Sequence, residues 1–365
     1  MKAKAAVFMG PEKDFEIREF DVVDAPAGYG RMELIASGIC GTDIHIHKGR
    51  LGGRVPSIIG HEFVGRITDI NKEDSEKFGL KIGDAAIADI AIPCGECILC
   101  KNGDDANCVH FKSAISGVLD EAPHFRGGYG EVNFTPATNL IKIPEDIDPT
   151  VATVFACPGP TAIHGCTLAE KAGVDLKNVN VAVVQGLGPV GTFSLMYLKR
   201  SGVKKVYAIT AFTDKKREDL ALELGADKVF CIDRDGNDNI KEELLKENGG
   251  IGVDLCVECS GAPVAVPFAF SILRNRGVYI VPGQYSQSGA VEIQPQLITF
   301  KALHIIGSSQ YSISDVNKYL EFLGNNKDLF PVIAKLASKY PLSKINEAIK
   351  DAKSGNNIKT VLVKD

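Results

Sequence analysis

The fold is decided by VNVAVVQGLGPVG, residues 179–191, in which an apolar run leads directly into the glycine pattern Gly186-x-Gly188-x-x-Gly191. The apolar run predicts a buried strand, and residues 190–202 after it have the apolar spacing of a helix. In such a unit the glycines allow a tight turn, close backbone approach to a pyrophosphate, and close packing of helix on strand. The amino end of the helix offers N–H groups and partial positive charge to phosphates. The predicted dinucleotide contacts are Gly186, Gly188, Pro189, Val190 and Gly191.

Strands and helices continue to alternate on the carboxyl side of this stretch. KKVYAIT (204–210) reads as a strand, KKREDLALELG (215–225) as a helix that ends in glycine, and VDLCVE (253–258) as another buried strand. Such alternation is typical of a doubly wound parallel sheet. We therefore predict a Rossmann dinucleotide-binding domain over residues 159–308.

The flanking regions have a different texture. Residues 1–158 contain short apolar segments broken by glycine and proline, such as RMELIASG (31–38) and EFVGRITDI (62–70), which predict a mostly β domain. Residues 309–365 depart from the alternation, and we expect them to pack back on that first domain. The predicted fold class is therefore α/β, with a Rossmann sheet and a second, mostly β, catalytic domain.

Composition narrows the class of protein. A chain of 365 residues exceeds the usual size of one domain, and 45% hydrophobic with 24% charged residues is ordinary for a globular protein. The net charge of −5 argues against a broad nucleic-acid surface, which needs a basic face. The amino terminus lacks the apolar run of a signal peptide, and no segment approaches the roughly 18 apolar residues of a membrane span. We expect a cytoplasmic protein that binds neither nucleic acid nor membrane.

The second strand of a dinucleotide-binding unit normally ends in an acidic residue that binds the ribose hydroxyls of NAD. Thr210 occupies this position, and Asp214 follows four residues later. Lys215 and Arg217 can instead meet the ribose phosphate of NADP, although such bases are equally typical of the solvated first turn of a helix. The expected cofactor is NAD or NADP, with a slight preference for NADP.

Four of the ten cysteines are concentrated in PCGECILCKNGDDANC, residues 93–108. Four thiolates in a short segment make a closed tetrahedral site, which is the structural arrangement of zinc. Four buried thiols are a poor alternative, because the intervening residues are polar and rich in glycine. An iron–sulfur cluster is the stronger competitor, and the rest of the chain favours zinc. The predicted structural zinc ligands are Cys94, Cys97, Cys100 and Cys108.

A second set of metal-binding side chains is dispersed along the chain. Cys40, His61 and Glu62 lie in the first 62 residues, and Cys157 comes just before the predicted dinucleotide unit. Two thiolates and an imidazole leave one position of a tetrahedron open, which is the arrangement of a catalytic zinc. A zinc ion in this site lowers the pKa of a bound alcohol, so that a hydride can leave its carbon. We therefore predict two zinc ions per chain.

At these residues the chain resembles the zinc-containing, medium-chain alcohol dehydrogenase family. CGTDIHIHKG (40–49), GHEFVG (60–65), the four-cysteine segment, GGYGEV (127–132) and GLGPVG (186–191) occur in the family's order and spacing, and the resemblance spans essentially the full length. It implies a GroES-like catalytic domain and reversible oxidation of a primary, secondary or polyol alcohol to an aldehyde or ketone with NAD(P). It also implies a homodimer or homotetramer.

The resemblance assigns roles around the dispersed metal site. Cys40, His61 and Cys157 would be zinc ligands, and Glu62 would be a fourth group, bound directly or held in reserve. Asp43 would orient the His61 ring and raise its basicity.

Further roles concern the proton and the cofactor. Thr42 would accept the alcohol proton and pass it through the cofactor ribose to His45, which can exchange it with solvent. His47 is expected to be an ordinary surface histidine. Thr161 and Lys359 match family positions that touch the cofactor.

Three alternatives remain beside a simple alcohol substrate. Polyol and amino-alcohol dehydrogenases of the sorbitol or threonine type belong to the same family, although they often replace the third cysteine ligand with an acid. A metal-independent enone or quinone reductase would lack the zinc ligands. A zinc-bearing binding protein would have no use for the dinucleotide motif.

Overall fold

The computed structural model describes residues 1–113, 115, 117–284 and 286–365, which form two compact units. Unit 1 comprises Met1–Pro160 together with Gln310–Asp365, and unit 2 comprises Thr161–Ser309. The domain boundaries after residues 158 and 308 stay predictions, because compactness alone does not show that a unit folds independently. Among the described residues, no helix has the length and apolar character needed to cross a membrane.

Unit 2 is built on a six-stranded sheet in which all neighbouring strands are parallel. In spatial order the strands are β12 (Lys228–Cys231), β11 (Lys205–Thr210), β10 (Val181–Gln185), β13 (Val253–Glu258), β14 (Leu273–Val281) and β15 (His304–Gly307). Every residue of β10 and β13 is buried, as expected for central strands covered on both faces. The predicted doubly wound parallel sheet is confirmed.

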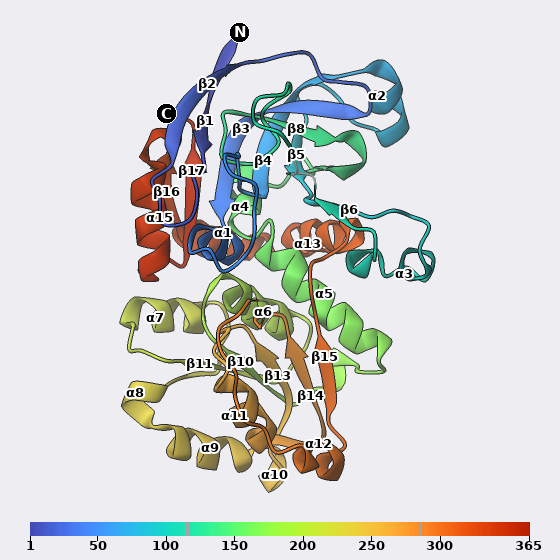
Figure 1. The fold of residues 1–365 in the computed structure, drawn as a ribbon. Helices are drawn as coiled ribbons and strands as arrows, with labels where there is room; N and C mark the ends of the chain where they lie inside the picture. The colour runs from blue at the N-terminus through green and yellow to red at the C-terminus, as the bar shows by residue number, and fades with distance from the viewer. Residues whose placement is uncertain (114, 116, 285) are drawn as a thin grey trace. The chain divides into compact units, whose positions relative to one another are not determined.

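Helices follow the strands of unit 2 in the expected alternation (Figure 1). They are α6 (Pro189–Arg200), α7 (Lys215–Glu223), α8 (Ile232–Asp235), α9 (Asn237–Leu245), α10 (Glu247–Gly250), α11 (Ala265–Ile272) and α12 (Gln296–Lys301). Helix α6 packs on β10 and β11, and α11 packs on β13 and β14. Because α6 starts immediately after the glycine turn that follows β10, its amino end lies at the carboxyl edge of the sheet, where doubly wound folds bind their ligands.

Unit 1 is centred on a seven-stranded, mostly antiparallel sheet. In spatial order the strands are β16 (Ala337–Pro341), β17 (Lys359–Val363), β3 (Tyr29–Ile39), β4 (Glu62–Ile70), β5 (Ala85–Ala88) and β9 (Leu140–Lys142), with β8 (Val132–Pro136) also paired to β3. Two small antiparallel pairs accompany it: β1 (Lys2–Val7) with β2 (Glu16–Asp21), and β6 (Ala91–Ile92) with β7 (Lys112–Ser113).

Helices are few in the amino-terminal part of unit 1 and frequent in its carboxyl-terminal part. They are α1 (Gly41–His47), α2 (Lys72–Phe78), α3 (Ile98–Lys101), α4 (Pro149–Val154), α13 (Ile313–Asn325), α14 (Phe330–Lys335) and α15 (Ile345–Ser354), while α5 (Pro158–Lys171) begins here and continues into unit 2. The predicted mostly β domain with a four-cysteine segment is therefore confirmed.

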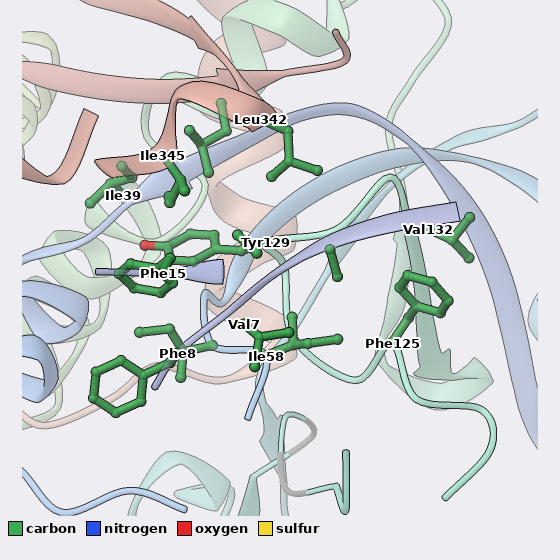
Figure 2. Packing of buried hydrophobic residues seen from close by; sticks show 14 of the residues in the cluster. Val7, Phe8, Phe15, Ile39, Ile58, Phe125, Tyr129, Val132, Leu342 and Ile345 are labelled. Carbon is green, nitrogen blue, oxygen red and sulfur yellow. The ribbon is translucent and has the colours of Figure 1, made fainter. Parts of the chain in front are cut away.

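One hydrophobic cluster joins the two ends of the chain within unit 1 (Figure 2). It brings Phe8 and Phe15 against Leu342 and Ile345, and the two phenylalanine ring centroids lie 5.7 Å apart. Burying one such side chain stabilises the fold by roughly 1.5–3 kcal/mol. Tyr129 belongs to the same cluster and is fully buried. The return of residues 310–365 to the first unit is thus driven by burial of apolar side chains.

Candidate metal centre and cofactor segment

Two antiparallel strands bring the first metal-binding residues together. β3 ends at Ile39 and β4 begins at Glu62, with Gly38 paired to Glu62 in the sheet register. Cys40 follows β3 directly as the residue that caps α1, and His61 immediately precedes β4. Cys40 and His61 are therefore neighbours because the end of β3 and the start of β4 pair side by side.

Four side chains form a compact group in unit 1. One ligand atom from each of Cys40, His61, Glu62 and Cys157 lies within 4.8 Å of the others, and the two sulfurs are 3.9 Å apart. Thiolate, imidazole and carboxylate are the donors that zinc prefers. His61, Glu62 and Cys157 are buried, which is expensive for such groups unless a ligand compensates them. The donor set fits a zinc ion.

The pKa shifts within this group favour the binding of a cation. A hydrogen bond from Cys157 holds the pKa of the Cys40 thiol well below its usual range, against the effect of burial, and His61 adds to the shift. The same hydrogen bond, together with burial, raises the pKa of Cys157. Burial would lower the pKa of His61, but the Asp43 carboxylate and the Cys40 thiolate raise it well above its usual value. The surroundings of Cys40 therefore favour its thiolate, the form in which sulfur binds metal.

Asp43 supports two of these residues at once. Its Oδ2 accepts a hydrogen bond from the backbone N–H of Cys40 at 2.8 Å, which also caps α1. Its Oδ1 lies 3.4 Å from Nδ1 of His61, and the carboxylate is fully buried. This placement agrees with the predicted orienting role of Asp43, and that role stays a prediction.

Glu62 is paired with a lysine from the last strand. Both side chains of the Glu62–Lys359 ion pair are completely buried, and Nζ of Lys359 also donates to the carbonyl of Ile39 at 3.3 Å. Burial raises the pKa of Glu62 to about 7, although the Lys359 ammonium opposes the shift. Oε1 of Glu62 has no hydrogen-bond partner among the described residues and is the oxygen left for a metal. The resemblance predicted a cofactor contact for Lys359, and this stays a prediction.

The second group of metal-binding side chains comes from one short segment of the chain. The four sulfurs of Cys94, Cys97, Cys100 and Cys108 also lie within 4.8 Å of one another, with 3.5 Å between those of Cys97 and Cys100. Backbone N–H groups point at the sulfurs, as in the 3.5 Å contact from Cys100 N to Cys97 Sγ. Such N–H donors from Cys100 and Val109 lower the pKa of Cys97 to about 6. Four sulfurs with no position left open fit a structural zinc.

The proposed proton-relay residues lie on α1 beside the dispersed group. Oγ1 of Thr42 is 3.7 Å from Sγ of Cys40. Burial lowers the pKa of the half-buried His45, and the positive charges of Arg50 and Lys48 add to the shift. The expectation that His47 is a surface residue is wrong.

His47 is buried because α1 turns it inward against the hydrophobic cluster. Its ring stacks on that of Phe15 with 5.6 Å between centroids, and it also contacts Phe8. The apolar pattern of a helix of seven residues is too short to show which of its faces packs against the core. The burial of His47 could therefore not be predicted from the sequence.

The glycine turn of unit 2 has the geometry that its sequence predicted. Gly186 has a φ of +94°, and a Cβ there would lie 2.8 Å from the backbone of Ser260. A Cβ on Gly191 would come within 1.9 Å of the Gly186 carbonyl oxygen. Gly188 caps α6 with nothing within 4 Å of its missing Cβ, and Pro189 starts the helix. An open backbone facing a helix amino end fits the pyrophosphate of a dinucleotide.

The residues expected at the ribose lie beside this turn. Thr210 ends β11, and Asp214 caps α7 by accepting from the backbone N–H of Arg217 at 3.1 Å. The Arg217 guanidinium donates to the Leu187 carbonyl at 2.8 Å, within the glycine turn itself. Lys215 pairs with the Asp219 carboxylate, one turn further along α7. Thr161 lies on α5, and its cofactor contact stays a prediction.

Two buried polar residues of unit 1 escaped the sequence reasoning. Tyr129 belongs to the motif GGYGEV, and its fully buried hydroxyl is affected by the charge of Asp43. Asp89 is 1% exposed, shares a cavity of about 10 Å³ with His61, and has a pKa that burial raises to about 7. Neither stands in a ligand spacing, so no sequence signal marked them.

Known protein families agree with this arrangement. The alcohol dehydrogenase GroES-like domain matches residues 29–145, and the zinc-binding dehydrogenase domain matches residues 189–325. The chain belongs to the zinc-binding, medium-chain alcohol dehydrogenase family, and it is a zinc-dependent, NAD(P)-linked oxidoreductase. The resemblance read from the motifs is confirmed, and the alternative of a zinc-bearing binding protein is wrong.

Individual relatives match four fifths or more of the chain. It is 30% identical over 301 residues to L-threonine 3-dehydrogenase of Pyrococcus furiosus, covering 81% of this chain and 80% of that protein. It is 27% identical over 370 residues to 5-exo-hydroxycamphor dehydrogenase of Pseudomonas putida, covering 99% and 98%. Its structure resembles that of an alcohol dehydrogenase from Thermotoga maritima with a TM-score of 0.89 and 26% identity, over 100% of both chains.

Proposed function

We propose that this chain oxidises a secondary alcohol reversibly to a ketone, with NADP preferred over NAD. The observation that carries the proposal is the compact group of Cys40, His61, Glu62 and Cys157 in unit 1, of which the last three are buried. A site with three strong zinc ligands and one exchangeable position suits catalysis better than structure.

The residues of unit 1 divide the chemical work. Cys40, His61 and Cys157 would hold the zinc, and Glu62 would serve as a fourth ligand or stay in reserve. Zinc, when bound, acts as a Lewis acid that makes the hydroxyl of an alcohol more acidic. The Thr42 hydroxyl, beside Cys40, would receive the hydroxyl proton.

Beyond Thr42, the proton needs an exit. His45 would pass it to solvent, since a half-buried imidazole exchanges protons near neutral pH. The resemblance, together with the position of both residues on α1, supports this relay.

Unit 2 supplies the cofactor site. The glycine turn and the amino end of α6 would bind the pyrophosphate, and Val190 lies in the first turn of that helix. Solved chains of this fold hold NADH in one case and NADP in another, so the fold does not choose between them. The preference for NADP is supported by Thr210 in the place of an acid and by the Arg217 guanidinium at the glycine turn.

The substrates after which the relatives are named support a secondary alcohol as the substrate of this chain. These relatives act on 5-exo-hydroxycamphor, L-threonine and sorbitol, all of which carry a secondary hydroxyl group. Sorbitol-type and threonine-type substrates therefore stay within the proposal. Primary alcohols are expected to react more slowly.

A substrate screen tests the proposal. Secondary, primary, cyclic and polyol alcohols and L-threonine are each assayed with NAD and NADP by nicotinamide absorbance, and zinc is counted by elemental analysis. We expect two zinc ions per chain and turnover of at least one secondary alcohol. Cys40→Ser should leave one zinc ion and abolish turnover, whereas retained turnover would refute the catalytic role of this site.

Assembly and location are further proposals. We expect a homodimer or homotetramer, which light scattering after gel filtration would distinguish from a monomer. None of the ten cysteines forms a disulfide, which supports a reducing compartment such as the cytoplasm. The acidic net charge supports the absence of nucleic-acid and membrane partners.

A further inference from the structure

Three polar side-chain atoms of unit 1, Oδ1 of Asp43, Nδ1 of His61 and the hydroxyl of Tyr129, are buried without a hydrogen-bond partner of ordinary geometry among the described residues. All three belong to buried residues, and a buried polar group without a partner is destabilising. A carboxylate only accepts hydrogen bonds, whereas the phenol and the imidazole N–H can donate them. The three atoms therefore complement one another.

The position of the Tyr129 ring is fixed by its surroundings. Its backbone N–H donates to the Ile59 carbonyl at 3.0 Å, and its carbonyl accepts from the N–H of Ala6 at 2.8 Å. A Cβ on Gly60 would lie 2.4 Å from the ring, so only glycine fits beside it. Figure 2 shows the hydroxyl at the end of the ring directed away from Val132, on the side where Ile39 and Phe15 lie.

Asp43 is the charged group with the strongest effect on this phenol. Burial raises the pKa of Tyr129 well above its usual range, and both the charge of Asp43 and a hydrogen-bonding interaction with it add to the shift. Asp43 in turn faces His61, with 3.4 Å between Oδ1 and Nδ1. Asp43 thus acts electrostatically on the buried Tyr129 phenol and lies in contact with the metal-binding imidazole of His61.

We propose that Tyr129 is a positioning residue for the zinc site. Its hydroxyl donates to Oδ1 of Asp43 and holds that carboxylate in the orientation that accepts the Nδ1–H of His61. The other ring nitrogen of His61 is then directed at the metal. This inference rests on the proposed catalytic zinc site and adds Tyr129 to it.

The expected size of the effect follows from the distance to the metal. Losing a partner that contacts a metal ligand directly lowers metal affinity about 10- to 100-fold. Tyr129 acts one contact further out, through a single neutral hydroxyl. We expect Tyr129→Phe to raise the dissociation constant of this site about 3- to 10-fold.

The experiment measures Zn²⁺ affinity of the full chain by competition with a chromogenic chelator. Cys40→Ser protein gives the contribution of the four-cysteine site, which is subtracted. Tyr319→Phe is the matched control, because it removes another fully buried hydroxyl of unit 1, which donates to the Ala152 carbonyl at 2.8 Å. The control should leave the dissociation constant unchanged. Equal affinities of Tyr129→Phe and unsubstituted protein would overturn the inference.

A double substitution separates positioning from general structural support. If Tyr129 acts through Asp43, Tyr129→Phe should weaken zinc binding no further once Asp43→Asn is present. Independent, multiplicative losses would contradict the proposed chain of contacts. If the unsubstituted chain bound only the zinc of the four-cysteine site, the proposed function itself would fail. That result differs from a failure of the Tyr129 inference, in which the unsubstituted chain binds two zinc ions and Tyr129→Phe binds them equally well.

A measurement without substitution at Tyr129 covers the case in which that variant does not fold. Zinc binding should change the near-ultraviolet absorption of one buried tyrosine, since its hydrogen bond to Asp43 tightens. The spectrum is recorded in a Tyr311→Phe background, because the buried Tyr311 phenol lies near Cys157 and would add its own change. Absence of a tyrosine difference spectrum on filling this site would overturn the inference.

Discussion

Gly38→Ala tests how closely the buried ion pair is fitted against β3. A Cβ at this position would lie 1.8 Å from Oε2 of Glu62 and 2.8 Å from Cε of Lys359. The carboxylate oxygen would have to move by about 1.5 Å to reach the roughly 3.3 Å of an ordinary C···O contact. Such a movement breaks the ion pair, because Lys359 is held in the same space by the Ile39 carbonyl.

Gly38→Ala should lower the stability of unit 1 for two reasons. Inserting a methyl group into a well-packed interior costs about 1–3 kcal/mol. Separating a buried ion pair costs about 3–5 kcal/mol, because each charge is left without its partner. Protonation of Glu62, whose pKa is about 7, lowers the cost of separating the ion pair, because the neutral carboxyl needs no charged partner. We therefore expect a loss of about 3 kcal/mol for unit 1, or roughly 6–12 °C in its thermal midpoint.

Calorimetry and elemental analysis measure the outcome. Gly307→Ala is the matched control, since this glycine also lies in a strand but has nothing within 4 Å of its missing Cβ. We expect the control to melt like the unsubstituted protein. We expect Gly38→Ala to melt earlier and to bind zinc less tightly at the Cys40 site, because Glu62 no longer has its position beside the metal.

An unchanged melting temperature and full zinc affinity in Gly38→Ala would refute this reasoning. They would mean that Glu62 and Lys359 can rearrange without loss, and that their pairing contributes nothing to the metal site. A lower melting temperature with full zinc affinity would assign the pair to stability alone.

Three further substitutions probe other parts of the chain. Cys97→Ser should lower thermal stability or disturb assembly more than it slows the chemical step, as judged by calorimetry and by kcat of the folded fraction. Lys215→Ala/Arg217→Ala should reduce the preference in kcat/KM for NADP over NAD about tenfold, through lost charge-assisted hydrogen bonds to the ribose phosphate; an unchanged ratio would contradict the cofactor proposal. The neutral form of His45 accepts the proton and its pKa is lowered by burial, so alcohol oxidation should fall as pH drops through that pKa. His45→Ala should slow turnover at neutral pH about 10²-fold, with partial recovery at high pH, and an unaltered pH–rate profile would remove His45 from the relay.

The features that could be predicted from sequence are those set by local spacing. Cys94 to Cys108 lie within one short segment, so their meeting required no knowledge of the fold. The glycines of 186–191 follow a strand and open a helix, and each is needed for a close backbone contact. The alternation of buried strands and helices along the chain likewise predicts the parallel sheet.

The features that could not be predicted depend on strand pairing across the sheet. Lys359 meets Glu62 only because β17 and β4 both flank β3, and nothing in KTVLVKD shows that its lysine is buried. Tyr129 and Asp89 are single polar residues that lie outside the strands, Asp89 directly after β5 and Tyr129 before β8. Their significance comes from burial beside Asp43 and His61, which follows from tertiary packing alone.

The pairing of Glu62 with Lys359 also has a consequence for biosynthesis. The two residues are 297 positions apart, and all of unit 2 is made by the ribosome between them. While the chain emerges, Cys40, His61 and Glu62 are exposed early, but the lysine that balances the Glu62 charge arrives only with the last strand of the sheet. From residue 157 onward a nascent chain therefore holds all four metal-binding residues without the lysine that balances the Glu62 charge, and the ion pair can form only after β17 has been inserted beside β3.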